Sequence, residues 1–307
     1  MKHLTIALTG LLCASAVLAR PAAARGLPDA TPFNIAITVD DLPAHGPVPA
    51  GTTRASIIAD HVRIMKAHGV PETYGFVNGK LVDRSAENAA ALDVWRKGGF
   101  PLGNHTYSHM NLNQAASLEA WQADVIAGEP AVASRMQGAD WRWLRFPNVA
   151  AGKDATQQAA ARAWLTQRGY RIAEVTMSFT DWAYAEPYGR CMARNDQEGL
   201  QALKADYLRH VDAVIAYAKA SSRQVFGRVV PQVLLTHVAA FSAVMLPEVL
   251  DRLEQAGARY VTLAQAQSDP AYAQPGGGYV IERAAVRQRI HLPANRERGI
   301  DLDALCR

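Results

Sequence analysis

Short apolar runs and helical patterns alternate along most of the chain, from about residue 34 to residue 261. The first run, Asn34–Val39 (NIAITV), is apolar apart from Asn34 and Thr38, which is typical of a strand buried on both faces. Ala55–Ala67 follows with apolar residues at helical spacing, and Gly69 ends that helix. Repeated about seven times, this alternation predicts an α/β fold with a parallel sheet. The pattern leaves open whether the sheet closes as a barrel or stays open and doubly wound.

The same reading assigns the remaining elements. The predicted strands are Asn34–Val39, Thr73–Val77, Phe100–Gly103, Arg142–Phe146, Arg171–Val175, Val229–Thr236 and Ala258–Val261. The predicted helices are Ala55–Ala67, Ala86–Lys97, Leu118–Met136, Thr156–Arg168, Leu200–Ala220 and Ala243–Gln255. The segment Thr180–Gln197 is interpreted as irregular, and Gly276–Gly278 opens a tail to which the pattern assigns no structure.

The N-terminus has the features of a signal peptide. Leu4–Leu18 is mostly apolar but too short to span a bilayer, and Ala22–Ala24 supplies the small residues that signal peptidase requires. We expect cleavage after about Ala24, so that residues 1–24 are removed and the protein is periplasmic or secreted. The alternative is a retained membrane anchor. No other segment is apolar enough to span a membrane, so no integral membrane segment is expected after cleavage.

Two cysteines, Cys191 and Cys306, remain once Cys13 leaves with the signal peptide. Export to an oxidising compartment favours a disulfide between them, which would tie the C-terminal tail to the middle of the chain. The alternative is two unrelated buried thiols. The formal net charge is only +4, and no dense run of Lys and Arg occurs. This composition gives nucleic-acid binding little support.

Polar side chains follow the predicted strands at the points where those strands end. In a parallel α/β fold the carboxyl ends of the strands share one edge, which is where functional sites are built. We therefore expect one site from residues that share this position: Asp40, Asp41, His105, His109, Arg145, Asp181 and His237.

His105 and His109 have metal-ligand spacing. Residues at i and i+4 share one face of a helix, so both imidazoles can reach one ion. A carboxylate from Asp40 or Asp41 would complete a two-His-one-carboxylate set with open positions. Adjacent side chains point in different directions, so one aspartate can bind metal while the other acts as a base. The alternatives are a surface His pair, an aspartate turn or N-cap, and a structural His237.

Together these residues resemble the polysaccharide deacetylase family, also called the NodB-homology or carbohydrate esterase family 4 enzymes. Five segments carry the resemblance, in the family's order: Thr38–Asp41, His105–His109, Arg145–Pro147, Asp181–Trp182 and Leu235–His237. They correspond to the Thr-Phe-Asp-Asp, His-Ser/Thr-x-x-His, Arg-x-Pro, Asp-Trp and Leu-x-His elements. The resemblance covers roughly residues 34 to 265.

The resemblance implies a role for each catalytic residue. Asp40 would be the general base, held by Arg145, and His237 the general acid, oriented by Asp181. The metal ligands would be Asp41, His105 and His109. Zinc is the first expectation for the metal, because two nitrogens and one oxygen with open positions suit it, although Co²⁺, Ni²⁺ or Mn²⁺ would also serve.

The resemblance also implies the pocket, the fold and the substrate. Trp182 and Leu235 would shape the acetyl pocket, with Pro147 and Asn148 beside the substrate and a backbone N–H near Asn148 holding the oxyanion. The family fold is a distorted (β/α)7 barrel, which we place at residues 30–268, with residues 269–307 as a C-terminal tail. The implied reaction removes N-acetyl groups from an amino-sugar glycan such as peptidoglycan, a chitooligosaccharide or an exopolysaccharide, and releases acetate.

The sequence also departs from the family pattern. Asn148 stands where the family usually has Tyr or Phe, and Val238 stands where Asp commonly follows the histidine. His45, close to the first motif, either touches substrate or is a solvent-exposed loop residue. Related hydrolases act on O-acetyl groups, imides or formamides, and those activities stay open. A non-catalytic glycan-binding protein is a further alternative, although Asp40 and His237 are both present.

Overall fold

The structure is a computed structural model that describes residues 29–294 and 299–307 of the 307-residue chain. The predicted signal peptide, residues 1–24, lies outside the described residues. Within the described part, no helix is both long enough and apolar enough to cross a membrane.

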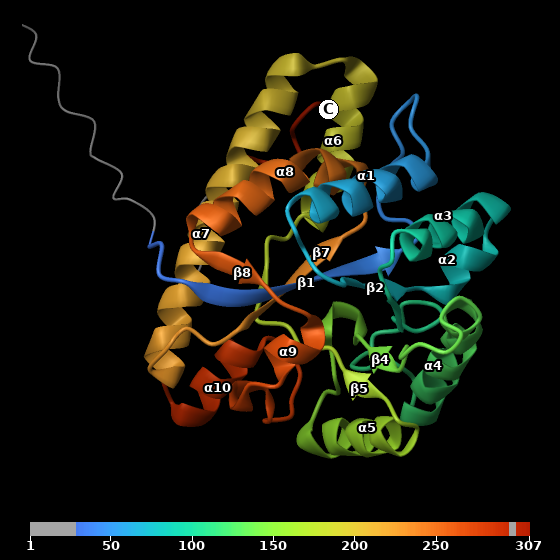
Figure 1. Cartoon of the computed structure of the whole chain (residues 1–307), viewed down its shortest axis with the longest axis vertical. Helices are drawn as coiled ribbons and strands as arrows, with labels where there is room; N and C mark the ends of the chain where they lie inside the picture. The colour runs from blue at the N-terminus through green and yellow to red at the C-terminus, as the bar shows by residue number, and fades with distance from the viewer. Residues whose placement is uncertain (1–28, 295–298) are drawn as a thin grey trace, which may run out of the picture.

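One parallel sheet runs through the centre of the molecule (Figure 1). Its order is β5–β4–β3–β2–β1–β7–β6, and β8 pairs in parallel with the start of β1. The strands in the described residues are β1 Phe33–Leu42, β2 Tyr74–Val77, β3 Leu102–Asn104, β4 Trp143–Leu144, β5 Arg171–Ile172, β6 Met177–Ser178, β7 Gln232–His237 and β8 Ala258–Tyr260. β1 lies in the sheet between β2 and β7. Its apolar side chains are buried on both faces of the sheet, as is typical of a strand in a parallel sheet covered by helices.

The sheet curls into a half-barrel surrounded by helices. Its two end strands, β5 and β6, do not pair with each other within the described residues. β5 is shorter than the predicted strand Arg171–Val175. A second short strand, β6, follows it along the chain, and the sequence pattern does not distinguish the two strands. The expected α/β fold of the NodB barrel type is confirmed, with the barrel present as a parallel half-barrel.

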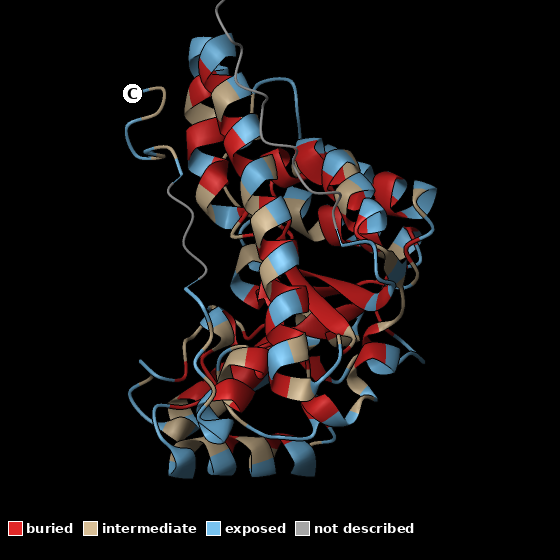
Figure 2. Cartoon of the chain, turned by 90° about the vertical axis from the view of Figure 1, so that its left-hand side faces the viewer, coloured by how far each residue is buried: buried red, intermediate tan, exposed pale blue. Residues whose placement is uncertain are grey.

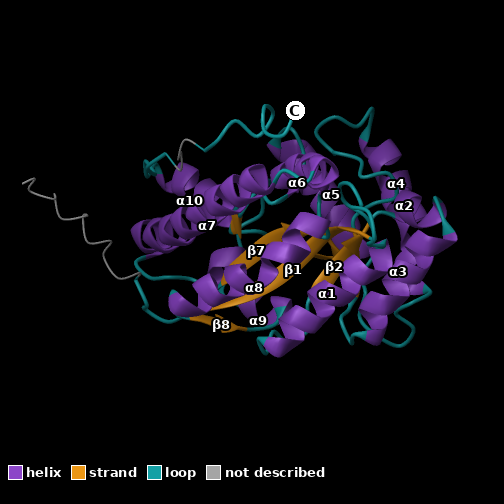
Figure 3. Ribbon diagram, turned by 90° about the horizontal axis from the view of Figure 1, so that it is seen from above, coloured by secondary structure: helices purple, strands orange, loops and turns teal. Residues whose placement is uncertain are grey.

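Helices cover the sheet on both sides (Figure 3). Their bounds are α1 Arg54–Ala67, α2 Gly79–Asp83, α3 Ala86–Lys97, α4 Leu118–Ala133, α5 Ala155–Gln167, α6 Trp182–Arg194, α7 Gln197–Phe226, α8 Ala240–Gln255, α9 Leu263–Gln267 and α10 Val280–Gln288. Short 3₁₀ turns lie at Pro147–Val149 and Pro270–Tyr272. The helix predicted over Leu118–Met136 forms with Pro130 inside it and ends at Ala133.

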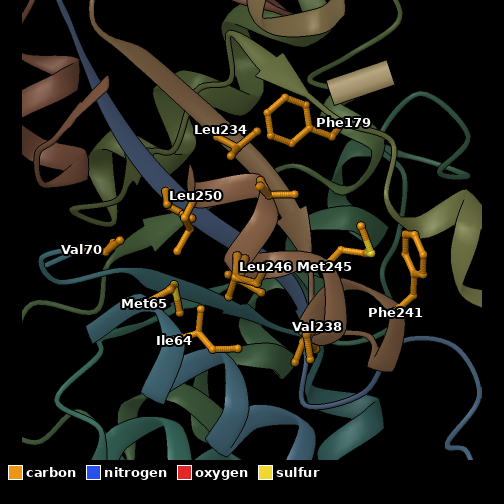
Figure 4. Packing of buried hydrophobic residues seen from close by; sticks show 14 of the residues in the cluster. Ile64, Met65, Val70, Phe179, Leu234, Val238, Phe241, Met245, Leu246 and Leu250 are labelled. Carbon is orange, nitrogen blue, oxygen red and sulfur yellow. The ribbon is translucent and has the colours of Figure 1, made fainter. Parts of the chain in front are cut away.

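The main core lies between the sheet and the helix pair α1 and α8. Figure 4 shows Met65 of α1, Leu246 and Leu250 of α8 and Leu234 of β7 directed into this layer. Figure 2 shows the buried residues concentrated on the strands and on the inner faces of the helices, whereas α7 alternates between buried and exposed positions. Burying these apolar faces is the main favourable contribution to folding.

The segment Thr180–Gln197 is not irregular as predicted, because most of it forms α6. Tyr184, Tyr188 and Cys191 recur at helical spacing and are all buried, so the apolar stripe is present in the sequence among the polar residues. α7 begins earlier than the predicted Leu200 because the Asp196 side chain accepts a hydrogen bond from the Gly199 N–H at 2.8 Å and caps the helix.

A disulfide joins Cys191 of α6 to Cys306 in the C-terminal tail. The bond closes a loop across a sequence separation of 115 residues. The Arg190 guanidinium adds to this attachment by donating hydrogen bonds to the carbonyls of Leu302 and Leu305. The tail is thereby held on the α6–α7 hairpin.

We predict that the double substitution Cys191→Ser with Cys306→Ser lowers the free energy of unfolding by about 2–5 kcal/mol, because the reduced chain loses a cross-link that restricts its unfolded state. Denaturant unfolding of both proteins measures the difference. Intact mass before and after reduction checks the bond itself, since the wild type should gain the mass of two hydrogen atoms. An unchanged mass would contradict the pairing.

Candidate metal centre

Two adjacent aspartates close the central strand β1. Asp40 lies beside His237 of β7 in the parallel register, so the sheet itself places these two residues together. Asp41 has a left-handed backbone conformation, with φ of 63°. Such a conformation is unusual for a non-glycine residue and turns its side chain away from the regular alternation of the strand.

His105 and His109 follow β3 in a loop, not in the helix that their spacing suggests. Thr106 and His109 both have positive φ, 64° and 61°, which breaks any helical repeat. The loop is held by polar contacts, including the Asn78 amide that donates to the His105 carbonyl at 2.9 Å. The two imidazoles nevertheless converge, and their ring centroids are 4.9 Å apart.

The Asp41 carboxylate and the two imidazoles form a compact donor set. Asp41 Oδ1 is 3.6 Å from His105 Nε2 and 3.5 Å from His109 Nε2. Ligands about 2.0–2.2 Å from one tetrahedral ion lie at about this separation. Asp41 Oδ1 is buried and has no hydrogen-bond partner among the described residues. A buried acceptor without a partner is costly, so these residues fit a divalent cation.

The protonation of the donor set suits metal binding. His105 Nδ1 lies 2.8 Å from the Arg145 carbonyl, so this nitrogen carries the proton and Nε2 presents its lone pair. Burial lowers the pKa of His105, which keeps the ring neutral. Burial alone would raise the pKa of Asp41, but the hydrogen bond from His45 and the nearby imidazoles bring it well below its usual range. The set is therefore a carboxylate with a neutral imidazole.

Asp40 is buried behind this donor set and lies against a fully buried arginine. Arg145 Nη1 is 3.4 Å from Asp40 Oδ2, and the same guanidinium donates to the Ala173 carbonyl and the Thr38 hydroxyl at 2.9 and 2.8 Å. These contacts fix the arginine in position. Asp40 Oδ1 has no partner among the described residues, so one carboxylate oxygen is available to accept a proton.

His237 and Asp181 form a buried pair on the other side of the site. The Asp181 carboxylate accepts from the His237 backbone N–H at 2.8 Å, from its ring Nδ1 at 2.9 Å and from the Ser242 hydroxyl at 2.7 Å. Burial opposes a charge on the ring, but the adjacent Asp181 carboxylate outweighs it and raises the pKa of His237 to about 9. His237 is therefore protonated at neutral pH and can donate a proton from Nε2.

Comparison with known proteins agrees with this arrangement. The polysaccharide deacetylase family model matches residues 28–167, which include Asp40, Asp41, His105, His109 and Arg145. The expected resemblance to the polysaccharide deacetylase family is confirmed for this part of the chain. No curated protein sequence matches the chain.

Solved structures of carbohydrate esterase family 4 proteins share the fold of this chain. The chitin deacetylase from the fungal pathogen Colletotrichum lindemuthianum is 20% identical, with a TM-score of 0.52 over 82% of this chain and 95% of that chain. A family 4 pseudoenzyme from Bacillus anthracis is 15% identical, with a TM-score of 0.52 over 77% of this chain and 66% of that chain. A mutant pseudoenzyme of the same family, with restored enzymatic activity, is 16% identical, with a TM-score of 0.52 over 77% and 68%. At these identities the likeness establishes the fold alone.

A cavity of about 340 Å³ opens over the Asp41, His105 and His109 donor set. Its walls include Trp182, Leu235 and Asn148 from the predicted pocket, and the Trp182 side chain is 52% exposed at the rim. Pro147 is buried and is not among the residues that line the cavity. A second cavity of about 280 Å³ adjoins the first and also borders Asp41. The two cavities share Asp41, His45 and His109 in their linings.

The cavity also contains residues that the motifs do not single out. They are Val149, Ser178, Tyr279 and His45. Of these four, the sequence suggests only His45 as a candidate, because it is close to the first motif. His45 Nδ1 contacts Asp41 Oδ2 at 3.0 Å, and its ring lies 5.1 Å from that of His237. His45 is therefore a partly buried neighbour of the donor set. Its position four residues after Asp41 is the sequence signal that indicates it.

We predict that Asp181→Asn brings the pKa of His237 from about 9 down to its ordinary value near 6.5 or below. The pKa of His237 falls because the substitution removes the negative charge that favours the imidazolium, whereas the burial that lowers the pKa remains. NMR titration of the imidazole in the metal-free protein measures this pKa. Asp212→Asn, an exposed aspartate paired with Arg252, serves as the control and should leave it unchanged. An unaltered His237 pKa in Asp181→Asn would refute the coupling.

Proposed function

We propose that this protein is a metal-dependent hydrolase that removes N-acetyl groups from an amino-sugar glycan and releases acetate. One observation carries the proposal: an orphaned carboxylate oxygen on Asp40 and a protonated His237 flank the Asp41 donor set in a single cavity. A base on one side and an acid on the other are what amide hydrolysis requires.

The metal would be held by Asp41, His105 and His109. Zinc is our first proposal, with Co²⁺, Ni²⁺ or Mn²⁺ as alternatives. When bound, a divalent cation there supplies Lewis acidity toward the amide carbonyl and toward water.

The chain's own residues would divide the remaining steps. Asp40 Oδ1 accepts a proton from the attacking water, and Arg145 keeps Asp40 in place. His237 then protonates the leaving nitrogen, so that the C–N bond breaks to give acetate and a free amine. An amine is a poor leaving group without this proton. A protonated His237 therefore suits an amide substrate, whose leaving nitrogen needs a proton.

The turn after β4 offers a donor for the oxyanion. The N–H groups of Val149 and Ala150 are hydrogen-bonded within the turn, to the carbonyls of Phe146 and Pro147. The Asn148 N–H has no such partner among the described residues and lies at the cavity wall. We assign it to the developing negative charge on the acetyl oxygen.

The cavities and the disulfide support the substrate class and the compartment. Two cavities of about 340 and 280 Å³ adjoin at Asp41, and their combined space suits more than one sugar unit. A disulfide between Cys191 and Cys306 is stable in an oxidising compartment. We therefore propose that the protein acts in the periplasm or outside the cell, on an acetylated glycan.

Acetate release tests the proposed function. Metal-loaded protein is incubated with N-acetylglucosamine oligomers and, in parallel, with acetylated xylan, and a chelator-treated sample is the control. We expect release from the oligomers, loss of release after chelation and recovery with Zn²⁺. Release from xylan alone would replace the amidase with an O-acetyl esterase. Release from neither substrate, with metal bound, would refute the acetyl-hydrolase assignment.

A further inference from the structure

A short segment from the C-terminal region passes over the candidate site. We call residues 276–280 the C-terminal strap. The Gly278 N–H donates to the Val149 carbonyl at 3.0 Å, and the Val280 N–H donates to the Val175 carbonyl at 2.8 Å. Val149 follows β4, and Val175 lies between β5 and β6 at the two ends of the sheet. The strap therefore connects both sides of the half-barrel beside the cavity.

Glycines permit this close approach. Gly276 and Gly278 have φ of 152° and 71°, which favours glycine. A Cβ on Gly277 would lie 3.2 Å from the Ala151 nitrogen and 3.4 Å from the Val149 carbonyl oxygen. Side chains at these positions would strain the strap or lift it from the turn after β4.

α10 anchors the strap on its other side. Ile281, Ala284 and Ala285 are buried in a cluster with Val225 of α7. Arg283 donates to the Glu174 carboxylate at 2.8 Å and to the Gln274 carbonyl at 2.9 Å. Tyr279, the strap residue just before α10, is thus held by contacts on both sides.

Tyr279 lines the cavity together with Ser178 and Leu235. Burial raises the pKa of Tyr279, and the neighbouring Ser178 side chain opposes this rise. Ser178 and Leu235 are register partners in the parallel strands β6 and β7, so their side chains point to the same face of the sheet. The phenol therefore reaches the part of the cavity that Leu235 lines.

The turn after β4, Pro147–Val149, has no aromatic side chain that could form this wall of the cavity. Asn148 is exposed, and its side-chain oxygen accepts a hydrogen bond from the Asn111 amide at 3.1 Å. Its side chain is thus engaged with Asn111 at the surface. An aromatic ring from the strap provides the apolar wall that Asn148 does not.

We propose that Tyr279 is a specificity-determining residue whose ring closes the acyl end of the cavity against Leu235 and limits the acyl group to acetyl. This inference rests on the proposed function, because it assigns that end of the cavity to the acyl group. A pocket wall of this kind discriminates about tenfold or more for each added methylene.

Two substitutions separate the ring from the hydroxyl. Tyr279→Ala removes both, and Tyr279→Phe keeps the ring. Val286→Ser on α10, where the side chain is 77% exposed, is the matched control on the same segment. Metal content and thermal midpoint are measured for every variant, so that a folding defect is recognised.

The readouts are kcat/KM for N-acetyl and N-butyryl glucosamine oligomers, and the calorimetric affinity of the metal-loaded protein for acetate and for butyrate. We expect the wild type, Tyr279→Phe and Val286→Ser to prefer the acetyl compound at least about tenfold, and Tyr279→Ala to narrow this preference to within about threefold. A wild-type preference retained in Tyr279→Ala would overturn the proposal. If Tyr279→Phe lost the acetyl preference as fully as Tyr279→Ala, the role assigned to the ring would be overturned, because this variant keeps the ring.

The carboxylate measurement keeps this test independent of turnover. If the wild type hydrolyses no amino-sugar substrate, the proposed function fails, whereas acetate and butyrate still report the size of the acyl end. A binding preference that is absent from the folded, metal-loaded wild type would refute the Tyr279 inference by itself.

Discussion

Asp40→Asn is expected to lower kcat at least about a thousandfold while the protein still binds its metal. An amide cannot accept the proton that the free Asp40 Oδ1 is placed to take, and general-base catalysis is worth about 10²–10⁴-fold. The substitution keeps the shape of the side chain, and Asp41, His105 and His109 retain their donor atoms. Steady-state kinetics and metal analysis on the same preparation measure the two effects.

Asp60→Asn is the matched control for this prediction, because Asp60 is a half-exposed aspartate that pairs with Arg63 on α1, away from the cavity. It should retain wild-type kcat. Substantial turnover by Asp40→Asn would assign the base to another group. Loss of metal from this variant would instead place Asp40 in the donor set.

His105→Ala is expected to lose both metal and activity. Substitution of a residue that only supports a ligand commonly weakens metal binding about 10–100-fold, so the loss of a ligand should exceed that range. Since metal that binds only the folded state stabilises it, Zn²⁺ should raise the thermal midpoint of the wild type and leave that of His105→Ala unchanged. Isothermal titration with Zn²⁺ and thermal scans measure the two effects.

His291→Ala controls for the general loss of a histidine, because His291 is exposed in the C-terminal segment and does not line the cavity. His105 is buried, so its loss also leaves a small void that lowers stability. His109→Ala, at a more exposed position, repeats the test with less effect on folding. Normal Zn²⁺ affinity in both ligand variants would refute the proposed donor set.

The strand-end residues illustrate what can be predicted from sequence. Buried parallel strands have continuous apolar runs, and a polar residue that ends such a run lies at the shared carboxyl edge. This reasoning places Asp40, His105 and His237 together, and in the structure they border one cavity. The prediction succeeds because each step depends on local sequence and on one general rule of sheet geometry.

The route by which His105 and His109 meet is not predictable in this way. Their spacing suggests a helix, whereas the structure has a loop with left-handed Thr106 and His109. Such backbone conformations cost energy in isolation and persist only where surrounding contacts impose them. α6 was likewise missed, because its buried stripe of Tyr184 and Tyr188 is interrupted by polar residues that obscure the helical period.

The sequence by itself determined the α/β class, the order of the elements and the candidate chemical groups, because apolar periodicity and residue type are local properties. Only the tertiary structure decided which atoms converge: the Asp41 oxygen with two imidazoles, the Asp181 carboxylate with His237, and Tyr279 from the C-terminal strap against Leu235. Tyr279 lies more than a hundred residues from the histidine loop, and no periodic signal links such distant positions. Long-range packing and hydrogen bonds alone bring it to the cavity.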